Sequence, residues 1–222
     1  MSAFEYQGYE LLSGLVPREA VQKLRDDLSE LTLGKYKGGL RNAEKKYPLI
    51  REIAQSPELQ RLAESYLTGI ASVVRVILFD KTPENNWRVS WHQDRTVTLS
   101  DKVDLEDWGP WSRKDGIYHV QPPIEVLDNM VSLRLHLDPA DQRSGCLRVL
   151  PASHNAGLLS AKQIQDYAES HSAEECIADT GDVLVMRPHL VHASSKVKTP
   201  SARRIIHIEY SGYQLPAGLN WA

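Results

Sequence analysis

The sequence predicts a mostly β fold, an antiparallel sandwich or barrel, preceded by a helical N-terminal third. Helix-periodic apolar patterns occupy the first 70 residues, and short β-branched or alternating runs follow from residue 71. Pro, Gly, Asp and Asn separate these runs. A doubly wound parallel sheet needs helices and strands to alternate along the chain, so helices first and strands afterwards argue against it.

Two helices are expected in the N-terminal third. The stretch "VPREAVQKLRDDLSEL" has Pro17 near its start, and apolar residues recur at spacings of three and four from Val21 to Leu31. In "SPELQRLAESYL", Ser56 is the expected N-cap and Pro57 the first helical residue.

Two irregular stretches have open roles. Residues 35–46, glycine-rich and basic, are interpreted as a solvated loop, with a clamp for an anionic substrate tail as the alternative. Residues 100–128 lack periodicity, and loops of that length inside compact domains usually carry function. They either pack locally on the surface or form a lid over the substrate with four ring-bearing side chains. These are Trp108, Trp111, Tyr118 and His119.

Five runs are expected to form the strands of the β core. They are "SVVRVILF", "MVSLRLHL", "CLRVL", "DVLVM" and "RRIIHIEY". Each is short, β-branched or alternating, and bounded by turn-forming residues. With 222 residues the chain is expected to form one domain, since mostly β domains often reach this length.

The composition excludes several classes of protein. The formal net charge is −3, whereas a dedicated nucleic-acid binder should show a basic excess. Neither Cys146 nor Cys176 belongs to a C-x-x-C pair, which argues against a zinc ribbon or a secreted disulfide scaffold. The N-terminus lacks a basic segment followed by an apolar run, and no 18 successive residues are apolar. We therefore expect no signal peptide, no membrane span and a cytoplasmic location.

Three pairs with the spacing His-x-Asp or His-x-Glu raise the question of a metal site. Alternate residues of a strand share one face, so each pair offers an imidazole and a carboxylate to one ion. In His136-x-Asp138 the aspartate precedes Pro139 and is expected to open a turn. The pair His207-x-Glu209 lies in the last expected strand, with no chain left downstream for a third ligand.

The pair His92-x-Asp94 in "VSWHQDRTV" differs from the other two. It lies where a strand gives way to the long loop, and a metal that meets a substrate is expected at such a barrel mouth. Downstream, "GDVLVMRPHLVHASS" offers His189 and His192. Two histidines and one carboxylate with open coordination positions form the facial triad of non-haem Fe(II) oxygenases. Arg203, eleven residues beyond His192, can grip a carboxylate by a bidentate pair.

The order of these motifs carries a resemblance. "WHQD", "GCLRVLPASH" and "GDVLVMRPHLVHASS" follow one another, with an arginine eleven residues beyond the last histidine. In this order and spacing, residues 71–211 resemble the phytanoyl-CoA dioxygenase family of Fe(II)/2-oxoglutarate-dependent oxygenases. The resemblance implies a double-stranded β-helix, or jelly-roll barrel. Residues 1–70 would provide helical support, and residues 71–215 would form the core of a single oxygenase domain.

The resemblance assigns roles to individual residues. Arg203 matches the residue that pairs with the far carboxylate of 2-oxoglutarate. Ser194 matches a hydroxyl near that carboxylate, and Arg134 matches a barrel-lining position that touches the cosubstrate in some members. Three residues match the iron ligands: His92, Asp94 and His192.

The remaining histidines are given structural interpretations. His189 precedes the distal ligand by three residues, which on a strand is the opposite face, and is expected to be structural. His154 is expected to cap a turn. His136 and His207 share strand faces with arginines 134 and 203, so each either lines the cavity or belongs to the core.

The implied activity is oxidative. The resemblance implies a dioxygenase that uses Fe(II), O2 and 2-oxoglutarate to hydroxylate a small-molecule substrate, with release of succinate and CO2. Related halogenases lack the carboxylate that Asp94 supplies, so its presence favours hydroxylation or desaturation. Two alternatives stay open: a non-catalytic sensor that binds a carboxylate ligand on the same barrel, and a zinc hydrolase with His₂Asp ligands. The primary substrate, whether an acyl-CoA, an amino-acid derivative or a secondary metabolite, and the oligomeric state are not readable from the sequence.

Overall fold

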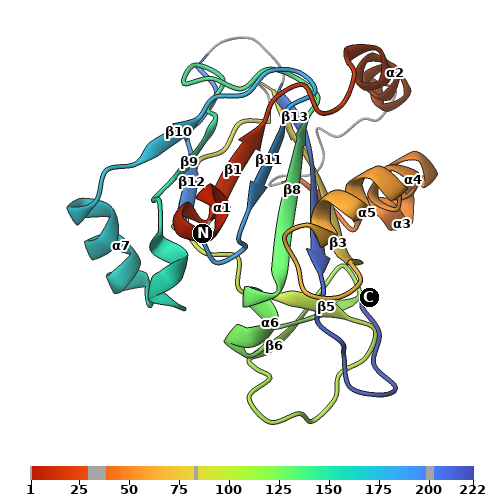
Figure 1. Cartoon of the computed structure of the whole chain (residues 1–222), viewed down its shortest axis with the longest axis vertical. Coiled ribbons are helices and arrows are strands. Elements are labelled where there is room, and N and C mark those ends of the chain that lie inside the picture. Colours follow the sequence, from red (N-terminus) through yellow and green to blue (C-terminus); the bar gives the residue numbers. More distant parts are fainter. Residues whose placement is uncertain (1, 30–38, 83–84, 199–202) are drawn as a thin grey trace.

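Strands dominate the computed structural model, which describes residues 2–29, 39–82, 85–198 and 203–222. Helices of the N-terminal third cover one side of the strands, and the helix of residues 161–170 lies on the opposite side (Figure 1), so the expected mostly β class with helices is confirmed. All five expected strands form. They are β3 (Ser72–Lys81), β8 (Met130–His136), β9 (Leu147–Val149), β11 (Val183–Met186) and β13 (Arg203–Ser211).

The largest sheet has six strands in the order β1-β11-β8-β13-β3-β2, and all neighbours are antiparallel. Its two edge strands, β1 (Tyr9–Leu12) and β2 (Leu40–Arg41), lie in the N-terminal third. The expectation of helices alone in that third is wrong for these residues. Tyr9 pairs with Met186 near the other end of the chain, and a four-residue strand is too short for its periodicity to reveal such a partner.

Two smaller sheets complete the β structure. The four-stranded sheet has the order β10-β9-β12-β4, and its side chains line the same cavity as those of the large sheet. The three-stranded sheet has the order β5-β7-β6 and lies at the lower end of the view in Figure 1. Among the described residues, no backbone ladder joins the three sheets into one closed barrel. The strand expected to end at the His92-x-Asp94 pair forms as β4 (Val89–His92). The remaining strands are β5 (Val97–Leu99), β6 (Trp111–Lys114), β7 (Ile117–Val120), β10 (Glu174–Cys176) and β12 (His192–Ser194).

Helices pack on the outer face of the six-stranded sheet. The two expected helices form as α2 (Arg18–Ser29) and α5 (Pro57–Glu64), and Ser56 caps α5 by accepting a hydrogen bond from the Leu59 N–H. Their apolar sides pack against alternate residues of the strands, such as Val76 and Leu78 of β3. The other helices are α1 (Ala3–Gln7), α3 (Ala43–Lys46), α4 (Pro48–Ala54), α6 (Ile124–Asp128), α7 (Ala161–Ser170) and the 3₁₀ helix Ser153–Ala156. None of the described helices is both long and apolar enough to cross a membrane.

The alternation along β3 separates the core from the cavity. Val76 and Leu78 are buried in the outer core, whereas their neighbours Arg75, Ile77 and Phe79 line the cavity. Successive side chains of a strand point to opposite faces, so one strand serves both purposes. The six-stranded sheet therefore carries the helices on one face and the polar interior on the other.

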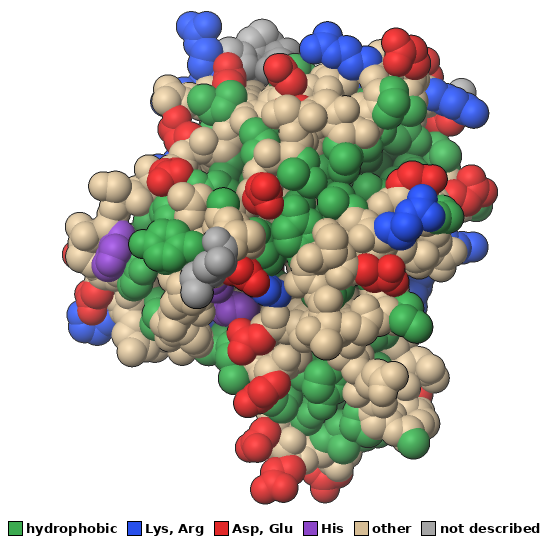
Figure 2. Space-filling view, in the orientation of Figure 1, with side chains coloured by type: hydrophobic (Ala, Val, Ile, Leu, Met, Phe, Trp, Pro, Cys, Tyr) green, Lys and Arg blue, Asp and Glu red, His purple; other side chains and the backbone are tan. Residues whose placement is uncertain are grey.

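The segment between β5 and β8 folds into a small layer of its own. Trp108 is buried in a hydrophobic cluster with Leu99 and Val120. None of the four expected lid residues is among those that line the cavity, and of this segment Lys114 alone does so. The structure thus favours local packing over a lid for these side chains. Figure 2 shows acidic side chains gathered at this lower end, where Asp101, Asp104, Glu106 and Asp107 are all exposed.

Candidate metal centre

The six-stranded and four-stranded sheets enclose a cavity of about 540 Å³. The residues that the sequence singled out come from β8, β12, β13, the end of β4 and the residues just after β4. All six predicted site residues line this cavity. They are His92, Asp94, Arg134, His192, Ser194 and Arg203.

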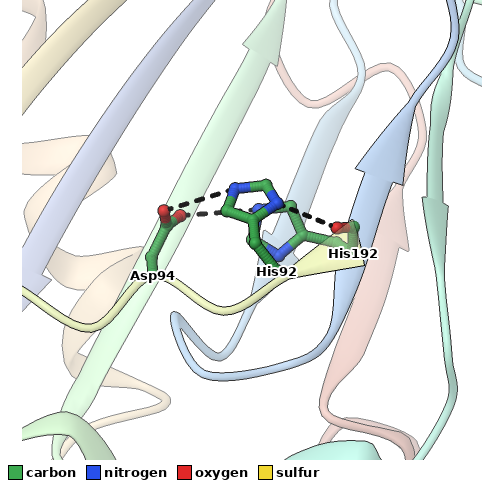
Figure 3. Close-up of side chains that lie close together, drawn as sticks. All are labelled: His92, Asp94 and His192. Carbon is green, nitrogen blue, oxygen red and sulfur yellow. Dashed lines mark hydrogen bonds and ion pairs between the residues drawn. The ribbon is translucent and has the colours of Figure 1, made fainter. Parts of the chain in front are cut away.

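Three of these side chains converge. His92 ends β4, and its register partner is His192, which begins β12. Asp94 Oδ1 lies 3.7 Å from His92 Nε2, and Asp94 Oδ2 lies 3.6 Å from His192 Nε2 (Figure 3). One ligand atom from each residue lies within 4.8 Å of the other two, which places all three within reach of one ion.

Backbone hydrogen bonds fix the orientation of both imidazoles. His192 Nδ1 donates to the Leu190 carbonyl at 2.8 Å. His92 Nδ1 lies 3.0 Å from the His192 carbonyl oxygen and 2.9 Å from that of Ser90. A carbonyl oxygen accepts only, so each Nδ1 carries the proton and each Nε2 presents a lone pair toward Asp94. Histidines that bind metals are held by such partners, so the three residues fit a divalent metal ion.

Gln93, the middle residue of the motif, points away from the cavity and anchors it. Its amide Nε2 donates to the carbonyls of Gly157 and His189, at 2.8 and 2.7 Å. Its Oε1 accepts from the Leu159 N–H at 2.9 Å and from Arg95 at 3.0 Å. A buried amide with all of these bonds made is rigid, and it holds the backbone of its two neighbours in place.

The electrostatics of the three residues suit a cation. Burial alone would raise the pKa of Asp94, but the imidazoles of His192 and His92 hold it below its ordinary value. Burial, with the neighbouring His92, lowers the pKa of His192 to about 3. Near neutral pH the site therefore presents an ionised carboxylate and a neutral imidazole, the forms that bind metal.

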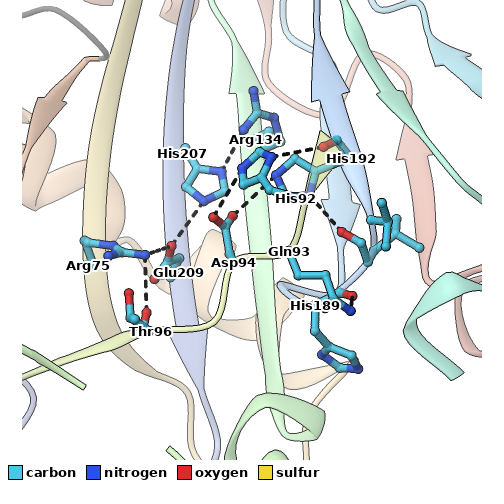
Figure 4. Close-up of polar contacts among 12 residues, drawn as sticks. Arg75, His92, Gln93, Asp94, Thr96, Arg134, His189, His192, His207 and Glu209 are labelled. Carbon is cyan, nitrogen blue, oxygen red and sulfur yellow. Dashed lines mark hydrogen bonds and ion pairs between the residues drawn. The ribbon is translucent and has the colours of Figure 1, made fainter. Parts of the chain in front are cut away.

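A second group could also hold an ion: Asp94, His207 and Glu209. Arg134 donates to His207 Nδ1 at 3.0 Å (Figure 4). Since a guanidinium cannot accept, the His207 proton lies on Nε2, which faces Glu209 Oε1 at 3.4 Å. Glu209 Oε1 is also bound by Arg75 at 2.5 Å. These contacts leave His207 without a lone pair for a metal, so His92, Asp94 and His192 are the better ligand set.

The far end of the cavity holds unpaired cations. Arg203 is buried, and its Nη1 donates to the Gly145 carbonyl. Its register partner on β3 is Lys81, whose Nζ donates to Ser194 Oγ at 3.0 Å and to the Ser195 carbonyl at 2.9 Å. No carboxylate among the described residues forms an ion pair with either cation. This arrangement is suited to an anionic ligand.

Lys81 is a site residue that the sequence reasoning missed. It lies two, four and six residues from Phe79, Ile77 and Arg75, so the alternation of β3 could have placed it on the same face. Burial, with the nearby charge of Arg203, lowers the pKa of Lys81 to about 7. Burial also lowers the pKa of Arg203 to about 10. An anion bound between them would raise both values.

The other candidate residues divide into those that line the cavity and those that serve the fold. His207 and Arg134 line the cavity, but His136 does not, and its Nδ1 lies 3.3 Å from the Asp182 carbonyl oxygen. His189 is buried behind the site against Asp128, as expected for a structural residue. His154 lies in the 3₁₀ helix Ser153–Ala156. Asp138 is buried and bound by Arg204 and Arg25, so the second His-x-Asp pair serves the fold.

The basic stretch 35–46 is only partly described. Lys35 and Lys37 lie outside the described residues. Arg41 is in β2 and lines the cavity, whereas Lys45 lies on α3. The interpretation as a solvated loop is therefore wrong for Arg41.

The sequence matches the family model described as "Phytanoyl-CoA dioxygenase (PhyH)" over residues 4–205. The chain belongs to the phytanoyl-CoA dioxygenase family. Fe(II), O2 and 2-oxoglutarate are the cofactors of this family, as the resemblance implied. The peroxisomal phytanoyl-CoA dioxygenase of Homo sapiens is 20% identical over 244 residues, which span 94% of this chain but 66% of the human protein.

Solved structures show the same fold. AviO1 from Streptomyces viridochromogenes Tue57 superposes with a TM-score of 0.67 at 22% identity, covering 96% of this chain and 94% of that one. HygX from Streptomyces hygroscopicus, crystallised with nickel and 2-oxoglutarate, has a TM-score of 0.67 at 17% identity, covering 94% and 84%. At these identities the likeness establishes the fold of the chain, and its substrate must be argued from its own residues.

Proposed function

We propose that the protein is an Fe(II)- and 2-oxoglutarate-dependent dioxygenase that hydroxylates a small molecule. The observation that carries the proposal is the convergence of the His92 and His192 Nε2 lone pairs with the Asp94 carboxylate on the cavity wall. Two histidines and one carboxylate favour Fe(II) and leave coordination positions open. Membership of the family supports the same activity.

The residues of the chain would hold and orient the reactants. When bound, Fe(II) with O2 would supply the oxidation: one oxygen atom of O2 enters succinate as 2-oxoglutarate loses CO2, and the other is inserted into a C–H bond of the substrate. His92, Asp94 and His192 would hold the metal, with both rings kept in place by their Nδ1 hydrogen bonds. The half-buried Asp94 stays ionised and provides the negative charge that keeps the divalent ion bound.

We further propose that the far carboxylate of 2-oxoglutarate binds at Arg203, Lys81 and Ser194. Lys81 donates to the Ser194 oxygen, so the Ser194 hydroxyl proton is free to donate to a carboxylate. The Arg203 guanidinium supplies a planar fork, whose geometry matches a carboxylate. Arg134 lies between these groups and the metal ligands and contacts His207, so we assign it to the wall beside the cosubstrate.

Release of succinate tests the proposal. Protein supplied with Fe(II), ascorbate, air and 2-oxoglutarate should form succinate and CO2 in equal amounts, at a slow uncoupled rate before the substrate is known. The Asp94→Ala variant should form none above background. Asp101→Ala, which removes an exposed carboxylate of the β5–β6 segment, is the matched control and should retain the wild-type rate.

The outcomes separate the alternatives. Binding of 2-oxoglutarate without any succinate would contradict the dioxygenase and indicate a carboxylate-binding protein on the same fold. Succinate formation that survives in Asp94→Ala would contradict the ligand assignment. Identification of the product by mass, as a gain of one oxygen or a loss of two hydrogens, distinguishes hydroxylation from desaturation.

A further inference from the structure

The cavity concentrates positive charge in a chain whose net charge is −3. Seven of its lining side chains are Arg or Lys, and Asp94 is the one carboxylate among the described lining residues. The chain as a whole does not share this excess, and the segment after β5 exposes four acidic side chains. The positive charge is therefore a property of the cavity.

Three of these cations lie at opposite ends of the cavity-facing part of the large sheet. Register pairs place Lys81 beside Arg203 at one end, and Arg75 beside Glu209 at the other. Arg75 and Lys81 are six residues apart on one strand, which corresponds to roughly 20 Å. The carbon chain of 2-oxoglutarate has four C–C bonds and spans at most about 6 Å. A cosubstrate held at Lys81 and Arg203 thus cannot reach the cations at the Arg75 end.

Arg41 and Lys114 are the unneutralised cations of that second end. Arg41 is the register partner of Ile77, which lines the cavity, so its side chain lies on the same face of the sheet. Lys114 comes from β6 of the small sheet. Arg75, by contrast, is neutralised by Glu209 at 2.5 Å. Neither Arg41 nor Lys114 forms an ion pair with a described carboxylate.

Arg41 and Lys114 lie close enough together to influence the same buried side chain, His119. Burial lowers the pKa of His119 to about 4, and the charges of Arg75, Lys114 and Arg41 all add to the effect. Arg75 Nη1 donates to His119 Nδ1 at 3.4 Å, so this imidazole is neutral and offers no negative charge to the cluster. The positive charge of Arg41 and Lys114 is left facing the cavity.

We propose that the primary substrate carries an anionic oxyacid group, a carboxylate or a phosphate, that binds to Arg41 and Lys114. The inference rests on the proposed function, because it assigns the Lys81 end to 2-oxoglutarate and leaves the Arg41 end for the substrate. The metal ligands lie near the level of Arg41 on the large sheet, since Asp94 groups with His207, and His207 and Arg41 are both register partners of Ile77. The anionic group would therefore bind beside the metal, with the oxidised carbon between the two.

Calorimetric titration tests the anion site without turnover. The protein is first loaded with Mn(II) and saturating 2-oxoglutarate without O2, so that the Lys81 end is filled. Inorganic phosphate, hexanoate and hexanoyl-CoA are the anionic probes, and hexan-1-ol is the uncharged match to hexanoate. Phosphate and at least one organic anion should bind, and hexan-1-ol should bind at least tenfold more weakly than that anion, the loss expected when a charged hydrogen bond is removed.

Single substitutions locate the site. Arg41→Gln and Lys114→Gln should each weaken anion binding about tenfold or more, and Arg41→Lys should restore part of the loss. Arg113→Gln is the matched control, because this neighbour of Lys114 is exposed, contacts Tyr118 and does not line the cavity. Of the two organic anions, binding by hexanoyl-CoA without hexanoate would assign the anionic group to the CoA phosphates, whereas hexanoate binding would assign it to a carboxylate.

The result can fail independently of the proposed function. Measurable binding of hexan-1-ol with the affinity of hexanoate, failure of all three anionic probes to bind, or wild-type anion affinity in both glutamine variants would overturn the anion site even if succinate is formed. If Arg41→Gln does not fold, Lys114→Gln, at an exposed position, carries the test by itself. Anion binding that depends on both cations in a protein that forms no succinate would sustain the site and refute the dioxygenase.

Discussion

Arg75 donates a 2.5 Å hydrogen bond to Glu209 within the wall of the cavity, and both side chains are almost fully buried. The two residues are register partners on β3 and β13. Glu209 also faces His207 Nε2, and Arg75 also contacts His119 and the Thr96 carbonyl. This pair therefore ties the large sheet to the small sheet directly beside the metal ligands.

Removal of one member of this pair should be costly. In Glu209→Gln the Arg75 charge stays buried without its partner, and breaking a buried ion pair costs about 3–5 kcal/mol. Urea unfolding at neutral pH measures the loss. Glu58→Gln is the matched control, because Glu58 pairs with Arg61 at 3.7 Å on the exposed surface of α5, where such pairs contribute about 0–1 kcal/mol. Equal losses in the two variants would contradict the role assigned to Glu209.

Acid should destabilise the fold partly through His136. Burial, with the charge of Arg134, lowers the pKa of His136 to about 4, whereas an unfolded histidine has a pKa of about 6.5. Between these values the unfolded chain binds more protons, so the free energy of unfolding falls as the pH falls from about 6.5 to about 4. In His136→Gln that slope should be shallower by up to about 1.4 kcal/mol per pH unit.

A second variant isolates the effect of the proton. Val185→Ala removes buried volume from β11 without removing a titrating group, so it should lower stability at every pH and leave the slope as in the wild type. If the slope of His136→Gln equals that of the wild type, the histidine does not protonate on unfolding in this window.

Local pattern predicted the class of the fold and its longest strands and helices. The five core strands and the helices α2 and α5 follow from periodicity and from caps such as Ser56, which act within a few residues. The edge strands β1 and β2 could not be predicted in this way, because each is short and gains its hydrogen bonds from distant residues such as Met186 and Leu78. Pairing of that kind is a property of the folded sheet.

In the candidate site, too, the residues predicted from local spacing differ from those that only the folded structure brings together. His92, Asp94 and His192 could be selected because their spacing and order are visible along the chain. The ion pair of Arg75 with Glu209 could not, because β13 and β3 had to be placed side by side before the two residues met. The His207-x-Glu209 pair of the last strand is structural, because Arg134 binds His207 and Arg75 binds Glu209 at the atoms that a metal would need.

Stabilisation of the protein by Mn(II) should depend on the aspartate of one His-x-Asp pair, Asp94, and not on that of the other, Asp138. Manganese binds the native state alone, so at a hundredfold excess over its Kd it should stabilise the wild type by about 2.7 kcal/mol. Asp94→Asn should abolish this increase. Asp138→Asn should weaken the buried contacts with Arg25 and Arg204, by about 3 kcal/mol, but keep the full increase on addition of Mn(II). Thermal unfolding with and without metal measures both effects, and a metal response lost in Asp138→Asn but kept in Asp94→Asn would reverse the assignment.

Neighbouring arginines on β13 should separate cosubstrate binding from stability. Arg203 faces the cavity, whereas Arg204 points to the other side and binds Asp138 at 2.9 Å. Arg203→Leu should weaken 2-oxoglutarate binding about 10- to 100-fold, the loss expected for a hydrogen bond to a charged group. Arg203→Lys should recover only part of it, because a lysine lacks the planar fork. Arg204→Leu should lower the free energy of unfolding and leave the affinity for 2-oxoglutarate unchanged. Titration of the Mn(II)-loaded variants with 2-oxoglutarate gives the affinities directly, and wild-type affinity in Arg203→Leu would remove this residue from the cosubstrate site.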